Sequence, residues 1–287
     1  MAEMMNPPNI PNRIFPSAKV EAEVARTPTA VPQTEHPAYR LAFQDHDFLL
    51  REDLRPVRFQ LELLKTELLL AEANIDSTFV FYGSARIPSP DEAPAVLAAA
   101  ETPEQKRVAQ RLAAKAHYYT VAQDLARIAS QHCKEGKRCF TVCSGGGPSI
   151  MEAANRGAWE VGAPSVGLNI VLPHEQVPNP YVTPGLSVQF HYFALRKLHF
   201  LMRAKAVAVF PGGYGTFDEL FELLTLVQTG KVAPLPILIY GKDFWSRVVN
   251  FEALAEEGVI SPRDLALFHF VETAEEGWEI VRAHYEL

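Results

Sequence analysis

The sequence predicts a Rossmann-like α/β fold, in which an open parallel β-sheet carries helices on both faces. From Thr78 onward, short apolar runs rich in strand-forming residues alternate with segments of helical periodicity. Runs that are apolar on both faces and are separated by helices are typical of a buried parallel sheet. Glycine-rich turns follow three of these runs, and in open sheets of this class ligands bind at such strand ends. We expect one domain of this class over residues 77–287.

Two segments precede the predicted sheet. Residues 1–38 carry seven prolines and few large apolar groups, which predicts a disordered, proline-rich arm without a fold of its own. Residues 39–76 form a second segment, in which leucines recur at helical spacing, most clearly in FQLELLKTELLLAEAN. This pattern predicts an N-terminal helical extension that packs on the main domain.

The elements of the main domain follow one another in regular alternation. The predicted strands are TFVFYGSA, RCFTVCSGG, SVGLNIVL, AVAVFPGG, PILIYG and ALFHFVE. The predicted helices are a long one around Glu104–His132, one after Pro148, one around Phe190–Arg203, one from Phe217 and one near Trp245.

Composition limits the classes of partner. With 287 residues and 48% hydrophobic residues, the chain has ample material for a packed core. A formal net charge of −7 argues against a protein that binds nucleic acid or a membrane surface mainly through charge, and it favours a small-molecule ligand. No run of eighteen apolar residues and no secretory-signal layout occurs, so we expect a cytoplasmic protein.

No metal or cofactor motif is recognisable. Two of the three cysteines, Cys139 and Cys143, fall in a predicted buried strand, where cysteine acts as a small apolar residue. Neither HExxH nor a CxxC pair occurs, so we expect no metal site. The glycine turns also lack GxGxxG spacing and the P-loop Lys-Ser/Thr pair, and we therefore expect neither NAD nor another cofactor.

Three glycine-rich strand ends are the candidate ligand-binding loops. They are YGSAR (82–86), SGGGPS (144–149) and PGGYGT (211–216), and the last two run directly into predicted helices. Free N–H groups at a helix N-terminus favour an anion, so three such loops together predict a phosphate cradle, whereas one loop alone would indicate only a tight turn. The candidate binding residues in these loops are Ser84, Gly145, Gly146, Gly147, Gly212, Gly213, Gly215 and Thr216.

Glu219 allows two interpretations. Thr216-x-x-Glu219 has the spacing of a capping box, in which the carboxylate would serve the helix N-terminus, and the same carboxylate is also placed to face a ligand on the glycine turn. The local sequence favours neither. Glu222 shares the same helix face, and we interpret it as a solvated edge residue. Upstream, Arg196 and Lys197 form a cationic pair suited to a phosphate, a carboxylate or a purine edge.

These motifs resemble a known family. PGGYGTFDE matches PGGxGTxxE, and GGGPSIMEAANRGA and LRK lie upstream in the order found in the LOG (Lonely Guy) family of nucleoside-5′-monophosphate phosphoribohydrolases. The likeness runs from about Thr78 to the C-terminus, and the segments before it exceed the short family pattern. Family members are often described as lysine decarboxylases, yet no pyridoxal-anchoring lysine motif is recognisable here.

The resemblance implies an activity and a set of residues. Gly212, Gly213, Gly215 and Thr216 would hold a 5′-phosphate with help from Ser84, and Arg196 and Glu219 would be catalytic. The implied reaction is hydrolysis of the N-glycosidic bond of a purine nucleotide such as AMP or an N6-substituted AMP, in a homodimer without a cofactor. A non-catalytic nucleotide-sensing module of the same fold is the alternative, because a fold and a phosphate cradle do not separate binding from catalysis.

Overall fold

The computed structural model describes residues 16–26, 29–132, 140–173 and 177–287. It divides into two compact units, and the division falls between Leu61 and Glu62, inside helix α4. The first unit contains α1 (Ala18–Val24), α2 (Pro32–Glu35), η1 (Pro37–Tyr39), η2 (Ala42–Gln44), α3 (His46–Leu49), η3 (Glu52–Leu54) and the start of α4 (Arg55–Glu72).

Two short helices lie inside the range predicted to have no fold. Helix α1 begins after Ser17, whose hydroxyl accepts from the Val20 N–H, and α2 begins at Pro32, a residue suited to the first turn of a helix. Local capping thus orders short stretches of a proline-rich segment. The rest of the predicted arm, residues 1–15 and 27–28, lies outside the described residues, and the predicted domain boundaries at residues 38 and 76 stay predictions.

The second unit is built around a seven-stranded parallel sheet of order β4-β3-β2-β1-β5-β6-β7. The strands are β1 (Thr78–Tyr82), β2 (Thr141–Ser144), β3 (Ser165–Ile170), β4 (Ser187–Phe190), β5 (Ala204–Val209), β6 (Ile237–Tyr240) and β7 (His269–Val271). Every pair of neighbouring strands is parallel, which confirms the predicted Rossmann-like α/β class.

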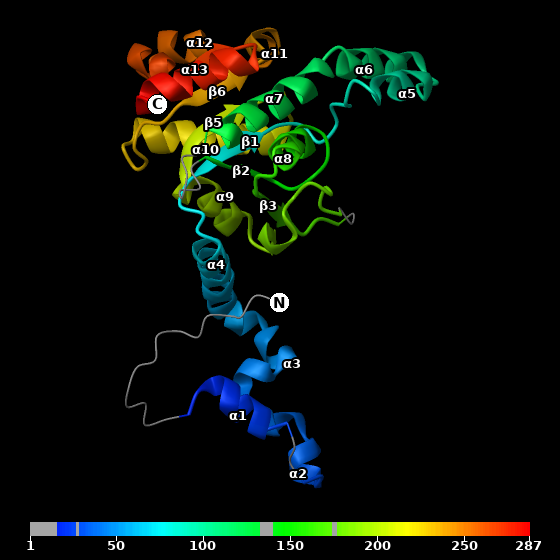
Figure 1. Cartoon of the computed structure of the whole chain (residues 1–287), viewed down its shortest axis with the longest axis vertical. Coiled ribbons are helices and arrows are strands. Elements are labelled where there is room, and N and C mark those ends of the chain that lie inside the picture. Colours follow the sequence, from blue (N-terminus) through cyan, green and yellow to red (C-terminus); the bar gives the residue numbers. More distant parts are fainter. Residues whose placement is uncertain (1–15, 27–28, 133–139, 174–176) are drawn as a thin grey trace. The chain divides into compact units, whose positions relative to one another are not determined.

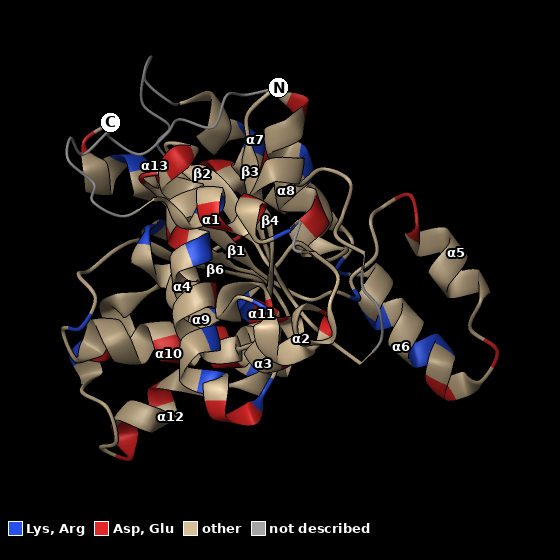
Figure 2. Ribbon diagram, turned by 90° about the horizontal axis from the view of Figure 1, so that it is seen from below, with Lys and Arg blue, Asp and Glu red and all other residues tan. Residues whose placement is uncertain are grey.

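Helices connect successive strands of this sheet (Figure 1). They are α5 (Ala93–Ala98), α6 (Pro103–Ala113), α7 (His117–Gln131), α8 (Ile150–Glu160), α9 (Phe193–Met202), α10 (Tyr214–Gln228), α11 (Lys242–Val248) and α12 (Phe251–Glu256), with η4 (Pro184–Leu186) and η5 (Pro262–Leu267). Helix α13 (Ala274–Tyr285) follows the last strand. Acidic and basic positions are interspersed along these helices (Figure 2).

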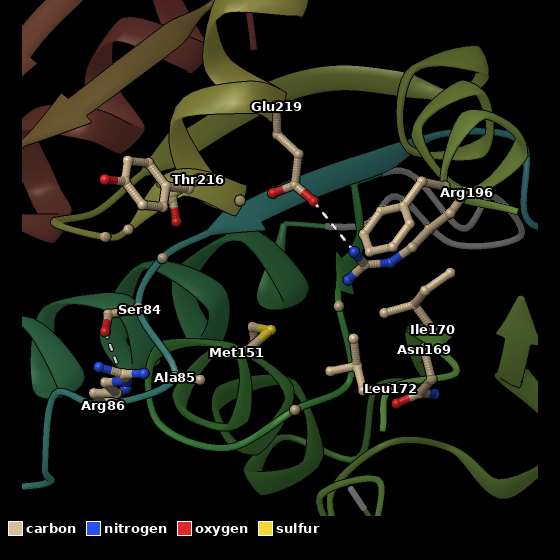
Figure 3. A pocket seen from close by; sticks show the side chains of 18 of the residues that line it. Ser84, Ala85, Arg86, Met151, Asn169, Ile170, Leu172, Arg196, Thr216 and Glu219 are labelled. Carbon is tan, nitrogen blue, oxygen red and sulfur yellow. Dashed lines mark hydrogen bonds and ion pairs between the residues drawn. The ribbon is translucent and has the colours of Figure 1, made fainter. Parts of the chain in front are cut away.

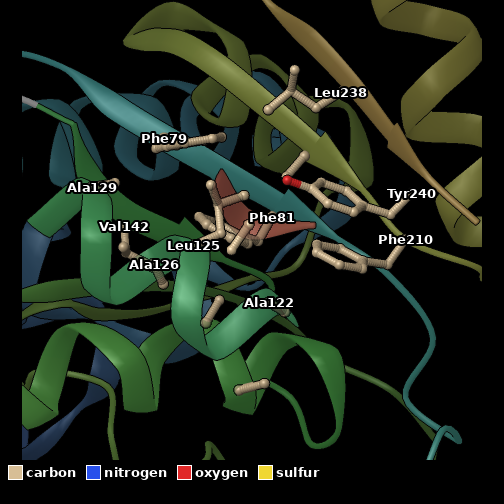
Figure 4. Close-up of a cluster of buried hydrophobic side chains, with 14 of the residues drawn as sticks. Phe79, Phe81, Ala122, Leu125, Ala126, Ala129, Val142, Phe210, Leu238 and Tyr240 are labelled. Carbon is tan, nitrogen blue, oxygen red and sulfur yellow. The ribbon is translucent and has the colours of Figure 1, made fainter. Parts of the chain in front are cut away.

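Residues of β1 alternate between the two faces of the sheet. Phe79 and Phe81 join the core beneath α7, α8 and α13, where Leu125 and Ala126 pack against them (Figure 4). Tyr82 lies on the other face, where its ring contacts Phe200 of α9 edge-on at a centroid distance of 5.2 Å. Burial on both faces is the reason why these runs are apolar at every position.

The structure differs from the sequence-based elements in several places, and helices α5, α12 and α13 were not predicted. The predicted helix around Glu104–His132 is two helices, because the chain turns at residues 114–116 so that α7 can lay Ala122 and its other small residues on the sheet. Strand β4 was not predicted, because it is an edge strand of four residues in which Val188 and Phe190 are buried and Gln189 is exposed.

Candidate active site

A cavity of about 1130 Å³ opens at the carboxyl ends of the strands (Figure 3). From β1 the strand order runs through β2, β3 and β4 in one direction and through β5, β6 and β7 in the other. The connections that follow β1 and β5 therefore lead to opposite sides of the sheet, and the crevice at that point is where ligands bind in open α/β sheets. Most of the predicted site residues line this cavity: Ser84, Gly145, Gly147, Arg196, Gly212, Gly213, Gly215, Thr216 and Glu219.

Backbone hydrogen bonds tie the candidate loops together. The Ser84 N–H donates to the Pro211 carbonyl at 3.1 Å, and the Ile150 N–H at the start of α8 donates to the Ser84 carbonyl at 3.4 Å. The Ser84 hydroxyl accepts from the N–H of Arg86 at 3.0 Å. The loop after β1 is thus held against both the loop after β5 and the start of α8.

The N-terminus of α10 supplies unused N–H groups to the cavity. This helix of 15 residues begins at Tyr214, its N-cap is Gly213, and no side chain caps it. Its first backbone bond runs from the Phe217 N–H to the Gly213 carbonyl at 3.1 Å, so the N–H groups of the residues before Phe217 have no partner within the helix. The positive end of the helix dipole adds to an anion site there.

The capping-box interpretation of Glu219 is wrong. Because α10 begins at Tyr214, Thr216 is already inside the helix, and Glu219 lies in its second turn. The Glu219 side chain points toward Arg196 instead, and its Oε1 lies 3.4 Å from Arg196 Nη1 (Figure 3). Only 12% of the Glu219 side chain and 11% of the Arg196 side chain are exposed.

Arg196 is fixed at several points. Its Nε donates to the Leu168 carbonyl at 2.7 Å, and its guanidinium carbon lies 5.0 Å from the centroid of the Phe200 ring. Gly145 leaves room for it, because a Cβ at that position would collide with Nη2 of Arg196. The glycine after β2 therefore has a packing role beside the catalytic candidate.

Burial sets the ionisation of Glu219. Removal from water raises the pKa of this carboxyl to about 7, and the positive charge of Arg196 opposes that rise. A buried carboxyl that titrates near neutral pH inside a cavity is typical of functional sites. The thiol of Cys143 lies nearby, fully buried, and burial raises its pKa to about 12.

Two predicted residues do not reach the cavity wall. Successive helical residues point about 100° apart, so Lys197 faces away from Arg196 and pairs with Asp218 at 3.2 Å and Glu222 at 3.1 Å. Gly146 has a structural role: its φ is +71°, and a Cβ there would collide with Asn169. Glu222 is thus a surface ion-pair partner, as interpreted from the sequence.

Sequence reasoning missed two groups of cavity residues. Arg86, on the loop after β1, is a single arginine without a motif around it, although YGSAR already contains it. The second group lies at the end of β3, in the loop after it and on β4: Asn169, Ile170, Leu172, Val177 and Val188. In Figure 3, Ser84, Arg86 and Thr216 lie at one end of the cavity, and Ile170, Leu172 and Asn169 lie at the other.

The described residues contain neither a candidate metal site nor a candidate membrane span. Among the described residues, no group of three or more histidine, cysteine, aspartate or glutamate side chains is placed to hold a metal ion. In the same part of the chain, no helix is both long enough and apolar enough to cross a lipid bilayer.

The sequence is similar to those of proteins named as phosphoribohydrolases. A family model described as "possible lysine decarboxylase" matches residues 151–281. Two relatives from Arabidopsis thaliana, named cytokinin riboside 5′-monophosphate phosphoribohydrolases LOG1 and LOG3, are 27% and 26% identical over 145 and 139 residues, or 49% and 47% of this chain. A probable cytokinin riboside 5′-monophosphate phosphoribohydrolase from Oryza sativa subsp. japonica, LOGL3, is 32% identical over 83 residues, 28% of this chain. The matches span 65%, 63% and 39% of these relatives, less than two thirds in each case.

Solved structures give weaker likenesses. The structural genomics target TM1055 is 21% identical with a TM-score of 0.46, and the match covers 72% of this chain and 99% of that chain. The molybdenum cofactor carrier protein from Chlamydomonas reinhardtii is 17% identical with a TM-score of 0.42, covering 74% and 99%.

Proposed function

This chain belongs to the LOG (Lonely Guy) family, and we propose that it hydrolyses the N-glycosidic bond of a purine nucleoside 5′-monophosphate. The substrate is AMP or an N6-substituted AMP, and the products are the free base and ribose 5-phosphate. The observation that carries this proposal is the buried Glu219–Arg196 pair, which faces a cavity beside the uncapped N-terminus of α10.

The 5′-phosphate binds at the end of the cavity formed by the loops after β1 and β5. Backbone N–H groups of Gly215 and Thr216 point from α10, and Ser84 adds a hydroxyl from the neighbouring loop. Arg86 lies at the same end and adds a guanidinium, which pairs well with phosphate oxygens. Phosphate binding fixes the ribose against Glu219, although the phosphate does not react. The binding energy of the phosphate thus serves to position the ribose.

Glu219 acts on the ribose. Breaking the bond between C1′ and the base nitrogen builds positive charge on the ribose ring, as in other glycosyl cleavages. A carboxylate held one helical turn beyond the phosphate site stabilises that charge and orients a water molecule. The water oxygen bonds to C1′, the base leaves with the bonding electron pair, and one proton of the water is passed on so that the base departs neutral.

The base occupies the far end of the cavity. Ile170, Leu172 and Val188 supply apolar surface for a purine ring there. Arg196 stands between this surface and Glu219, where its charge polarises the base or orients the nucleotide. An arginine stays protonated at all physiological pH values, so we assign Arg196 an electrostatic role and not that of a proton donor.

A panel of nucleoside monophosphates tests the proposal. The purified protein is incubated with AMP, N6-prenyl-AMP, GMP, IMP, CMP and UMP, and chromatography measures free base and ribose 5-phosphate. We expect turnover with AMP or N6-prenyl-AMP, and a rate about a hundredfold or more lower with the Glu219→Gln variant. If a nucleotide binds tightly but no member of the panel releases its base, the protein is a nucleotide-sensing module and not a hydrolase. Homodimerisation, which the family resemblance implies, stays a prediction that sedimentation would test.

A further inference from the structure

The second half of α4 lies against α9, the helix that carries Arg196. Two carboxylates on α4, Glu62 and Glu67, contact the two ends of α9. Both carboxylates belong to the same compact unit as the sheet. These contacts join a helix outside the family pattern to one that contributes to the cavity.

Glu62 binds the N-terminal end of α9. Its carboxylate accepts from the backbone N–H of His191 and, at 3.2 Å, from the backbone N–H of Tyr192. These two residues form the turn between β4 and α9, and Tyr192 is the N-cap of the helix without a cap bond from its own side chain. A negative charge at this position also opposes the positive end of the α9 dipole.

Glu67 binds the C-terminal end of α9. Its two carboxylate oxygens pair with the guanidinium of Arg203 at 2.6 and 3.0 Å, the bidentate geometry that gives strong, directional pairs. Arg203 is the C-cap of α9, and its Nε also donates to the Ile75 carbonyl at 3.0 Å. This pairing with Arg203 lowers the pKa of Glu67, so the carboxylate stays charged at neutral pH.

The contact between Glu62 and Tyr192 is connected to Arg196 through a backbone hydrogen bond. The Arg196 N–H donates to the carbonyl of Tyr192 at 3.1 Å, and the N–H of that same Tyr192 is held by Glu62. From Arg196 the guanidinium reaches Glu219 at 3.4 Å. A shift of the turn at Tyr192 therefore moves the backbone that carries Arg196.

We propose that Glu62 is a positioning residue for Arg196: it pins the first turn of α9 so that the guanidinium stands over Glu219, while Glu67 anchors the other end of the helix. The inference rests on the proposed function for its kinetic consequence. Its structural consequence, the distance between Arg196 and Glu219, does not depend on any substrate. The side chains that we assign to the phosphate, Ser84 and Arg86, belong to the loop after β1 and not to α9, so the contact with Glu62 acts on the reacting groups and not on phosphate binding.

The test compares three variants of the full chain. Glu62→Ala removes both acceptors from the turn, Glu62→Gln keeps one, and Glu72→Ala makes the same change at an exposed position of the same helix. We expect Glu62→Ala to lower kcat for AMP by about tenfold or more, as small misplacements of catalytic groups do. The KM of Glu62→Ala should stay within about twofold of the parent value. Glu62→Gln should show a smaller fall in kcat, and Glu72→Ala should have the kcat and KM of the parent.

A second readout requires no turnover. NMR of ¹³C-glutamate-labelled protein follows the titration of the Glu219 carboxyl, with Glu219→Gln used to assign its signal. Arg196 holds the pKa of Glu219 down, whereas Asp218 and Glu222 push it up and Lys197 opposes them. Displacing Arg196 should therefore raise the pKa of Glu219 in Glu62→Ala and not in Glu72→Ala.

The two readouts separate the possible failures. If the parent hydrolyses no nucleotide but the Glu219 titration moves in Glu62→Ala, the proposed function fails and the positioning role stands. A Glu219 titration that is the same in the parent, Glu62→Ala and Glu62→Gln would overturn the positioning role, whatever the kinetics. Should Glu62→Ala melt below the assay temperature, Glu62→Gln carries the comparison, and an unchanged titration in that folded variant would likewise overturn it.

Discussion

Nη1 of Arg196 lies 3.4 Å from Oε1 of Glu219, although the two residues are 23 positions apart and belong to different helices. Strand β5 explains the meeting, because α9 leads into this strand and α10 leaves its carboxyl end on the same face of the sheet. The pair therefore stands beside the crevice between β1 and β5. Its oxygen and nitrogen atoms define where a reacting sugar would have to lie.

Replacement of Glu219 by glutamine should separate binding from catalysis. The amide nearly preserves the volume of the side chain but cannot balance positive charge on the ribose. Turnover of AMP should fall by about a hundredfold or more, as it does when one electrostatic stabiliser is removed. Calorimetry should find AMP still bound. Hydrolysis near the parent rate would mean that another carboxylate acts. The next candidates in the sequence are Glu222, which is paired with Lys197, and Glu175, which lies outside the described residues.

The reaction rate should depend on pH through Glu219. Burial raises the pKa of this carboxyl to about 7, and the ionised form is the one that stabilises the ribose cation. The value of kcat/KM, which reports ionisation of the free enzyme, should therefore rise with pH through about 7 and level off above it. A pH series of kcat/KM with AMP measures this, and a value that falls across the same range would show that the protonated acid is the active form.

Stability should depend on pH with the opposite sign. The pKa of Glu219 is about 7 in the folded protein against an ordinary value of 4.5, so the folded state keeps a proton that the unfolded state has lost. The contribution of this group to stability is complete below about pH 4.5 and falls as pH rises to 7, by roughly 2–3 kcal/mol. Glu219→Gln lacks this loss. Urea denaturation of both proteins at pH 5 and pH 8 measures this: the free energy of unfolding of the variant, relative to that of the parent, should be higher at pH 8 than at pH 5.

Removal of Arg86 should weaken the binding of the phosphate. A lost charge-assisted hydrogen bond is worth about 1.5–3 kcal/mol, which corresponds to roughly ten- to hundredfold in KM for AMP. Because this residue lies at the phosphate end of the cavity, kcat should change little in Arg86→Ala. Arg107→Ala, on the exposed face of α6, serves as the matched control. The parent should prefer AMP to adenosine at least tenfold, and equal preference would contradict the phosphate site.

A methyl group at Gly145 should disturb the guanidinium. The Cβ of alanine would collide with Nη2 of Arg196 and lie 2.8 Å from Sδ of Met151, so Arg196 must move. We expect Gly145→Ala to lower kcat by about tenfold or more with a small change in melting temperature, because the ends of two long side chains can yield. Gly185→Ala is the control, since a Cβ there meets nothing within 4 Å. Full activity of Gly145→Ala would show that the position of Arg196 is not critical.

Much of this fold can be predicted from the sequence because burial leaves a simple pattern. The six predicted strands are all present. Five of them are central strands of a parallel sheet, which must be apolar on both faces, as Phe79 and Val80 are, and the sixth, β7, is an edge strand. The edge strand β4 was missed, because one exposed side chain in four residues removes that pattern. Alternation and apolar runs thus identify the middle of the sheet better than its edge.

The site was less predictable, because side-chain direction decides it. Adjacent residues Arg196 and Lys197 are alike in the sequence, yet one enters the cavity and the other pairs with Asp218 outside it. The role of Glu219 depended on where α10 begins, and a start at Tyr214 in place of the predicted Phe217 removes the capping box. Arg86 has no pattern around it, and only the convergence of the loops after β1 and β5 identifies it.

The hydrogen bond between the Ser84 N–H and the Pro211 carbonyl also has a consequence for how the chain folds. It joins the loop after β1 to the loop after β5, and these neighbours in the sheet are separated in the sequence by three other strands. Contacts between such distant segments form late, because a long loop must close before they add stability. A nascent chain that ends before β5 therefore has no anion site, and a nucleotide can stabilise this protein only after the centre of the sheet is complete.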